Sequence, residues 1–151
     1  MVDFMVLIGP SGSGKSTWAN KFIKENPSYH IVATDTIRGE LWGDENDQQN
    51  PQKVFNTAYS KAVELLNSGL DVVFDATNLK RKDRVRLLNY IDSKVPGVYK
   101  SCRVFTTTDK LCKSRQELRD RKVPDEVIDR QFKNFMPPTE DEGWDEIKFI
   151  N

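Results

Sequence analysis

Short apolar segments alternate along the chain with longer segments in which apolar residues recur every three or four positions. The apolar segments, which we expect to be strands, are residues 4–8, 29–33, 71–77, 98–106 and 146–150. The segments between them predict helices at residues 15–25, 52–69, 80–93, 109–122 and 124–135. This order predicts an α/β fold, in which a central, mostly parallel five-stranded sheet is flanked by helices on both faces.

The composition favours one domain that covers residues 1–151. Lys and Arg together number 23, as do Asp and Glu, so no net positive charge attracts nucleic acid to the whole molecule. A nucleic-acid partner would therefore need a local basic patch. No apolar stretch is long enough to span a membrane, and no signal-peptide pattern is present. Because Cys102 and Cys112 have no metal-binding spacing, we expect two free thiols and a cytoplasmic protein.

A glycine-rich segment, GPSGSGKST at residues 9–17, lies between the first expected strand and the first expected helix. It fits the Walker A pattern G-x-x-x-x-G-K-[ST], in which backbone N–H groups surround phosphate oxygens at a helix N-terminus. Lys15 would reach the β- and γ-phosphates, and the Ser16 hydroxyl would bind Mg²⁺. We therefore predict binding of ATP and Mg²⁺, with ATP contacts from Gly9, Ser11, Gly12, Ser13, Gly14, Lys15, Ser16 and Thr17.

Other features of the chain narrow the class of protein that would bind this triphosphate. A regulatory GTPase would show an Asn-Lys-x-Asp signature, which neither TNLK (77–80) nor TTDK (107–110) fits. An oligomeric motor usually needs a longer chain. A small kinase remains, and it must hold a second substrate and remove a proton from it.

Asp35 and Arg38 fit that role, because they follow the second expected strand, whose carboxyl end faces the same crevice as the phosphate loop. The Asp35 carboxylate would accept the acceptor's proton, and Arg38 would bind an anionic acceptor or the moving phosphate. Another interpretation makes Asp35 a helix N-cap with an i+3 ion-pair partner. Both roles can hold at once.

Three polar residues end the third expected strand at the same crevice. Asp75 is placed to order Mg²⁺ or its waters, or to brace Arg38. Thr77 and Asn78 are candidates for substrate binding, although Asn78 is also a typical turn residue.

Two basic segments complete the candidate site. In a helical lid at about 109–122, Arg115 and Arg119 lie one turn apart and could close over phosphates, although a solvated helix is the alternative. The cluster KRKDRVR at 80–86 has a solvated face as its default interpretation, with contacts to an acceptor's backbone phosphates as the other.

With these residues assembled, the chain resembles the kinase domain of the 5′-hydroxyl polynucleotide kinases, which have a P-loop kinase-type fold. The resemblance covers nearly the whole length and is carried by GPSGSGKSTWA (9–19), TDTIR (34–38), FDATN (74–78) and RQFKNFMPPTEDEGWDEI (130–147). It implies that Asp35 is the general base, that Arg38 contacts the acceptor, and that Arg115 and Arg119 are the lid arginines. A small shift of register would replace Arg119 with Arg121. The Asp-x-Asp-Gly-Thr signature of the 3′-phosphatase domain found in many relatives is missing here.

The sequence thus favours transfer of the ATP γ-phosphate to a 5′-OH end of DNA or RNA. A kinase for a nucleoside, nucleotide or other small metabolite is the first alternative, and a nucleotide-dependent binding or switch module without transferase activity is the second. The resemblance also makes a homo-oligomer possible. The preference between DNA and RNA stays open.

Overall fold

The computed structural model describes residues 1–43, 50–116 and 123–150. Five strands form a single sheet: β1 (Asp3–Ile8), β2 (Tyr29–Ala33), β3 (Asp71–Asp75), β4 (Tyr99–Phe105) and β5 (Glu146–Ile150). Their order across the sheet is β2-β3-β1-β4-β5, and every pairing is parallel. The predicted α/β fold is therefore confirmed, and the sheet is parallel throughout.

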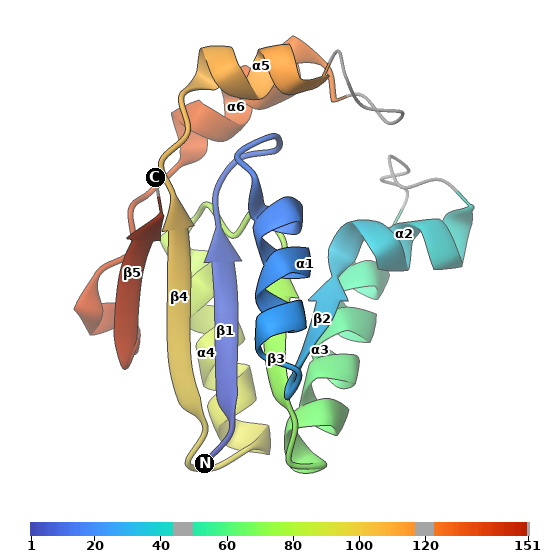
Figure 1. Cartoon of the computed structure of the whole chain (residues 1–151), viewed down its shortest axis with the longest axis vertical. Helices are drawn as coiled ribbons and strands as arrows, with labels where there is room; N and C mark the ends of the chain where they lie inside the picture. The colour runs from blue at the N-terminus through green and yellow to red at the C-terminus, as the bar shows by residue number, and fades with distance from the viewer. Residues whose placement is uncertain (44–49, 117–122, 151) are drawn as a thin grey trace.

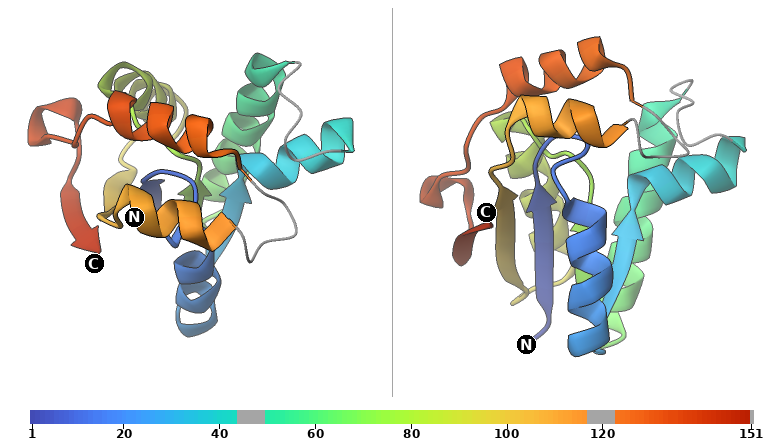
Figure 2. Two further views of the ribbon diagram at one scale, coloured as in Figure 1. Left: turned by 90° about the horizontal axis from the view of Figure 1, so that it is seen from above. Right: turned by 45° about the horizontal axis from the view of Figure 1, so that its top comes forward.

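Helices cover both faces of this sheet (Figure 1). Helix α1 (Lys15–Glu25) packs on one face, and α3 (Pro51–Asn67) and α4 (Arg81–Lys94) pack on the other. Helix α2 (Thr34–Trp42) directly follows β2 and lies against α3. Helices α5 (Asp109–Gln116) and α6 (Asp125–Asn134) lie across the carboxyl end of the sheet, as Figure 2 shows from above.

The two faces of the sheet have separate apolar cores, because alternate residues of each strand point to opposite sides. Phe4, Val6 and Ile8 of β1 pack toward α3 and α4, whereas Met5 and Leu7 pack toward α1. All five side chains are buried. This arrangement brings the carboxyl ends of β1, β2 and β3 to one edge, and the loops that follow these strands carry the candidate residues.

The C-terminal segment is locked onto α4 by a buried ion pair. Arg84 of α4 donates to Glu142 of the 3-10 turn η1 (Glu140–Glu142) through Nε–Oε1 at 2.8 Å and through a second nitrogen to Oε2 at 2.9 Å. Trp144 donates to the same carboxylate at 3.0 Å. Burial acts to raise the pKa of Glu142, but the hydrogen bonds from Arg84 and Trp144 outweigh it and hold this pKa below its ordinary value.

This ion pair corrects the interpretation of one member of the basic cluster at residues 80–86, whereas Lys80, Lys82 and Arg86 are exposed, as a solvated face requires. Arg84 is completely buried, so it neither forms part of a solvated face nor reaches an acceptor's phosphates. Arg81 of the same cluster is bound to Asp141, with a 3.1 Å contact. Arg81 and Arg84 anchor the C-terminal turn because acidic partners about 60 positions later in the chain fold back onto them.

Both cysteines have the state that the sequence predicts. Cys102 and Cys112 are free and buried, and burial raises the pKa of Cys102 to about 12. Among the helices of the described residues, none has both the length and the apolarity that a membrane span requires.

Candidate functional site

The phosphate loop occupies residues 9–14, between the end of β1 and the start of α1. Gly12 and Gly14 have φ values of 81° and 99°, a left-handed conformation that side chains rarely adopt. Gly14 is also the N-cap of α1. These glycines let the backbone turn its N–H groups inward ahead of a helix N-terminus, which is the arrangement that binds phosphate.

Lys15 lies over this loop and is buried. Its Nζ donates to the carbonyl oxygens of Gly9 and Pro10 at 2.8 and 2.9 Å. These two carbonyl oxygens help to hold the ammonium group at the loop. A phosphate in the loop would offer the same group a charged acceptor, which forms the stronger hydrogen bond.

Ser16 and Asp75 meet at the first turn of α1. The Ser16 hydroxyl donates to Asp75 Oδ2 at 2.8 Å, which joins α1 to the last residue of β3. A hydroxyl and a carboxylate are oxygen ligands of the kind that Mg²⁺ prefers, usually with water and substrate phosphates completing the shell. These two residues fit a magnesium ion at the edge of the phosphate loop.

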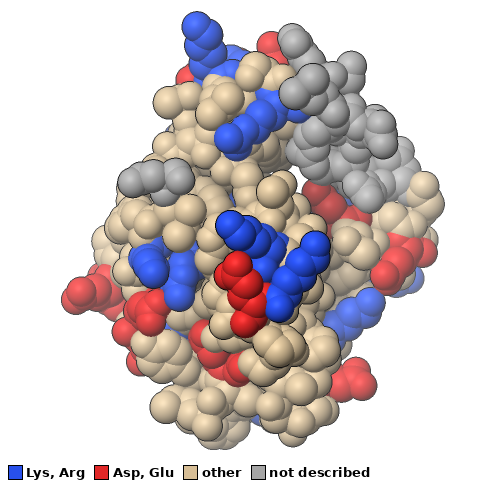
Figure 3. All heavy atoms as spheres, in the orientation of Figure 1, with Lys and Arg blue, Asp and Glu red and all other residues tan. Residues whose placement is uncertain are grey.

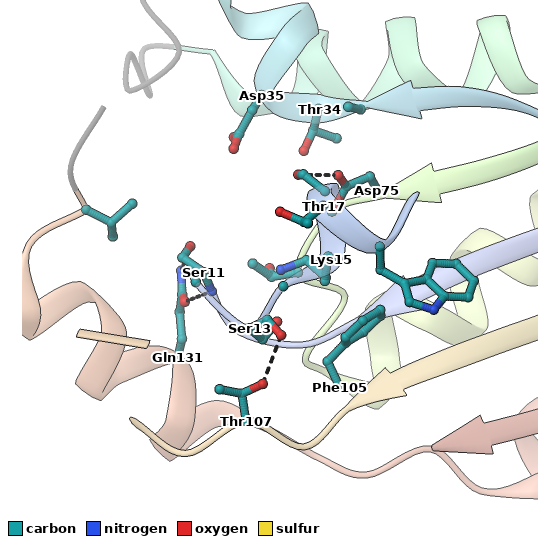
Figure 4. Close-up of a pocket in the computed structure, with 18 of the residues that line it drawn as sticks. Ser11, Ser13, Lys15, Thr17, Thr34, Asp35, Asp75, Phe105, Thr107 and Gln131 are labelled. Carbon is teal, nitrogen blue, oxygen red and sulfur yellow. Dashed lines mark hydrogen bonds between the residues drawn. The ribbon is translucent and has the colours of Figure 1, made fainter. Parts of the chain in front are cut away.

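Asp35 lies in the first turn of α2, directly after β2, and Arg38 follows one turn later. The N-cap of this helix is Ala33, so the interpretation of Asp35 as the N-cap is wrong, whereas its i+3 ion pair is present. Arg38 donates to Asp35 Oδ1 at 2.8 Å. The Arg38 side chain is only 11% exposed, whereas that of Asp35 is 46% exposed. The more buried arginine therefore fixes the position of the more exposed carboxylate. Figure 4 shows Asp35 across the pocket from Lys15 and Ser11.

Thr77 and Asn78 differ in their positions. Thr77 lines the pocket. Asn78 has a φ of 52° and donates from Nδ2 to the carbonyl oxygens of Leu7 and Ala76 at 2.9 and 3.2 Å. Asn78 is not part of the lining, and its conformation and hydrogen bonds are those of a turn residue; its role in substrate binding stays a prediction.

The lid region contributes Arg115 from α5. Its guanidinium donates to the Gly12 carbonyl oxygen at 2.8 Å and lines the pocket. The predicted second lid arginine, Arg119, lies outside the described residues, as does its alternative Arg121. The helix predicted at 109–122 is observed as α5 over Asp109–Gln116, and residues 117–122 are not described.

Helix α6 also lines the site, which sequence reasoning did not assign. Arg130 and Gln131 line the pocket, and the Gln131 side chain binds Ser11. Both residues belong to the RQFKNF part of the segment that carries the family resemblance. That resemblance was the available signal, although it gave no role to either side chain.

One pocket of about 1390 Å³ joins these groups. Its lining also includes the aromatic residues Trp18, Phe55 and Phe105, and Figure 4 shows Phe105 and Asp35 on different sides of the phosphate loop. Most of the predicted site residues line it: Ser11, Gly12, Ser13, Gly14, Lys15, Ser16, Thr17, Asp35, Arg38, Asp75, Thr77 and Arg115. The pocket is large enough for a nucleotide and part of a second substrate.

Gly9, which was predicted to contact ATP, lies outside the lining of this pocket. A Cβ atom at Gly9 would come within 2.8 Å of Ser13 Oγ and 3.0 Å of Phe105 Cβ. The glycine is therefore required by packing beneath the phosphate loop.

Charged side chains of both signs lie on the surface of the molecule. On the face drawn in Figure 3, Lys and Arg side chains are interspersed with Asp and Glu. A substrate would therefore interact with individual charged side chains rather than with an extended surface of one charge.

A family model described as an AAA domain matches residues 4–138. The chain belongs to the AAA domain family. This match includes the phosphate loop, Asp35, Arg38, Asp75 and Arg115.

Solved structures of P-loop kinases share the fold of this AAA domain. A chain from the Pnkp1/Rnl/Hen1 RNA repair complex has a TM-score of 0.70 and 24% identity, over 88% of this chain and 43% of that one. A fungal RNA kinase has a TM-score of 0.73 and 16% identity, over 100% of this chain and 38% of that one. A gluconokinase from Sinorhizobium meliloti has a TM-score of 0.59 and 20% identity, over 98% and 81%.

The comparison confirms the predicted P-loop kinase-type fold. The chain spans less than half the length of the RNA repair protein and the fungal RNA kinase. Their fold is therefore shared, and the chemistry of this chain has to be argued from its own site.

Proposed function

We propose that this chain is an ATP-dependent polynucleotide 5′-hydroxyl kinase. The observation that carries the proposal is the placement of Asp35 across a single pocket from the phosphate loop, with Arg38 bound to it at 2.8 Å. A phosphate loop alone binds a triphosphate. A carboxylate that faces the loop from another strand end adds the group that a phosphoryl acceptor requires.

The donor half of the site would bind ATP. The N–H groups of the phosphate loop surround the phosphates, and Lys15 and Arg115 neutralise charge on the transferred group. Ser16 and Asp75 would hold Mg²⁺, which withdraws negative charge from the phosphate oxygens when it is bound.

The acceptor half would hold the 5′-hydroxyl group near Asp35. During transfer, the bond from the γ-phosphorus to the β–γ bridging oxygen breaks and a bond to the acceptor's 5′-oxygen forms. The hydroxyl proton passes to the Asp35 carboxylate, and ADP leaves with the bonding electrons. Arg38 keeps that carboxylate oriented, and Arg119 is proposed as a second lid arginine beside Arg115.

Support for a polynucleotide acceptor comes from the resemblance of four segments to the polynucleotide kinases, and from the shared fold with an RNA repair protein and an RNA kinase. A kinase for a small metabolite is the second candidate, because a gluconokinase also shares the fold over 98% of the chain. Both candidates use Lys15 and Asp35 in the same way.

Replacement of Asp35 tests the reaction class. We expect Asp35→Asn to lower kcat by about 10²- to 10⁴-fold, which is the usual contribution of a general base, and to leave ATP affinity nearly unchanged. Glu40→Gln is the matched control, because Glu40 is on the same helix and forms an exposed ion pair with Lys61. Unchanged turnover in Asp35→Asn would instead favour a nucleotide-dependent switch module in which Asp35 only pairs with Arg38.

A further inference from the structure

Gln131 of α6 makes two hydrogen bonds to Ser11 of the phosphate loop, 120 positions away in the chain. The Ser11 backbone N–H donates to Gln131 Oε1 at 2.8 Å. In return, Gln131 Nε2 donates to the Ser11 hydroxyl at 3.1 Å. Both ends of the amide are thus used at a single residue, and Figure 4 shows the two side chains next to each other.

Ser11 lies at the end of the loop that should meet the transferable phosphate. Helix α1 begins at Lys15, and we place the inner phosphates at its N-terminus, four residues beyond Ser11. Figure 4 shows Ser11 beside Gln131, away from Phe105, with Asp35 across the pocket. In-line transfer places the γ-phosphate between the loop and the Asp35 carboxylate, which is the side on which Ser11 lies.

The lid helices hold the middle of the same loop. Arg115 donates to the Gly12 carbonyl oxygen at 2.8 Å, and Thr107 donates to that of Ser13 at 2.9 Å. A Cβ atom at Gly12 would lie 2.7 Å from Gln116 Nε2, so α5 packs directly on the loop. The contact from Gln131 extends this support to the Ser11 end.

Helices α5 and α6 are joined to each other as one unit. Cys112 of α5 shares a small apolar cluster with Val123 and Ile128, and Lys113 pairs with Asp129 at 2.6 Å. Because α6 is packed on α5 in this way, the position of Gln131 depends on the position of both helices relative to the phosphate loop.

We propose that Gln131 is a positioning residue that links the position of α6 to the conformation of the phosphate loop at Ser11. Through this link it favours binding of the triphosphate over binding of the diphosphate. The inference rests on the proposed nucleotide site and is independent of the acceptor. Removal of the amide would leave the Ser11 N–H without its acceptor and let that end of the loop relax. Binding of the γ-phosphate would be weakened, whereas binding of the inner phosphates, which are held at α1, would not change.

The test is calorimetric binding of Mg·ADP and of the Mg complex of the β,γ-imido analogue of ATP. We expect Gln131→Ala to weaken binding of the analogue about tenfold, the effect of losing one or two hydrogen bonds, and to change ADP binding by less than about twofold. Ser11→Ala, which removes only the hydroxyl contact, should give a smaller loss of the analogue. Gln52→Ala is the control, since Gln52 bonds Asn56 on the exposed face of α3.

The same data contain the results that would overturn the proposal. Equal weakening of ADP and the analogue would make Gln131 a general support of the loop, and unchanged binding of both would make the contact incidental. In the double variant, the losses of Ser11→Ala and Gln131→Ala should not add, because the two residues share one contact. Additive losses would contradict the coupling. A wild-type protein that binds neither nucleotide would overturn the proposed function and this inference with it.

Discussion

The hydroxyl of Ser16 donates to Asp75 Oδ2 at 2.8 Å, which ties the first turn of α1 to the carboxyl end of β3. Because β3 pairs with both β1 and β2, this contact lies between the phosphate loop and the α2 residues Asp35 and Arg38. It is therefore the point at which the two halves of the pocket meet.

Loss of the Asp75 carboxylate should reduce the binding of magnesium. We expect Asp75→Asn to weaken Mg·ATP at least tenfold and to leave the affinity for ATP without Mg²⁺ nearly unchanged, since a neutral amide is a poorer ligand for Mg²⁺. Nucleotide affinity measured across a magnesium titration checks this. Asp71→Asn is the control at the other end of the same strand, and an equal loss in both variants would argue against a role in metal binding.

Arg115 should act on transfer more than on binding of the product nucleotide. In Arg115→Lys the charge remains but the planar fork that donates to Gly12 is lost. We expect kcat to fall by about 10²-fold or more, with ADP affinity within a few fold of the wild type. Lys110→Ala, an exposed change on the same helix, should leave both values unchanged. If ADP affinity fell as much as kcat, Arg115 would serve mainly to hold the nucleotide.

The buried pair of Arg84 and Glu142 should contribute to stability. Arg84→Ala leaves the Glu142 carboxylate buried without its partner, so we expect the free energy of unfolding to fall by about 3–5 kcal/mol. Arg81→Ala removes the exposed pair with Asp141 and a longer 3.5 Å contact to Glu142, while the two bonds from Arg84 to Glu142 remain, so it should cost about 1 kcal/mol. Chemical denaturation of both variants gives the comparison. Similar losses of unfolding free energy in the two variants would show that burial of the Arg84–Glu142 pair adds nothing to stability.

The same pair predicts a dependence on pH. The pKa of Glu142 is lowered below its ordinary value of 4.5, so its contribution is complete above that value and is lost as the pH falls through the lower pKa of the folded state. The difference in unfolding free energy between the wild type and Glu142→Gln should therefore be constant near neutral pH and shrink below about pH 4.5. A difference that grew on acidification would contradict the assignment.

The sequence predicted the parts of the site that depend on local pattern. The strand, the glycine-rich loop and the helix at residues 3–25 are adjacent in the chain, so hydrophobic periodicity and the spacing of Gly14, Lys15 and Ser16 were sufficient. Asp35 was found in the same way, because it follows a strand end that parallel topology brings to the loop.

The remaining features depend on partners far away in the chain. The basic run at 80–86 looks like a solvated face, and only the return of Glu142 onto α4 shows that Arg84 is buried. Gln131 is a neutral side chain on a polar helix, so nothing in its neighbourhood indicates that it binds Ser11. Asn78 fits both a turn and a binding pattern, and its φ of 52° agrees with the turn.

Salt should separate the two classes of acceptor. A single-stranded acceptor bound through about three phosphates should lose affinity roughly 20-fold between about 50 and 200 mM salt, because bound counterions are released. A neutral nucleoside should show almost no change. The Michaelis constant for each acceptor, measured with ATP saturating at every salt concentration, checks this. A flat response for the oligonucleotide would remove backbone phosphates from the recognised groups.

Transfer of label from γ-labelled ATP to a matched set of acceptors tests the central claim most directly. The set consists of 5′-OH DNA and RNA oligonucleotides, their 5′-phosphorylated twins, and nucleosides, nucleotides and gluconate. The account predicts label on the 5′-OH oligonucleotides alone, and loss of that label in Asp35→Asn. Label on small acceptors alone would contradict the polynucleotide assignment, and no label on any acceptor, with ATP still bound, would contradict phosphoryl transfer itself.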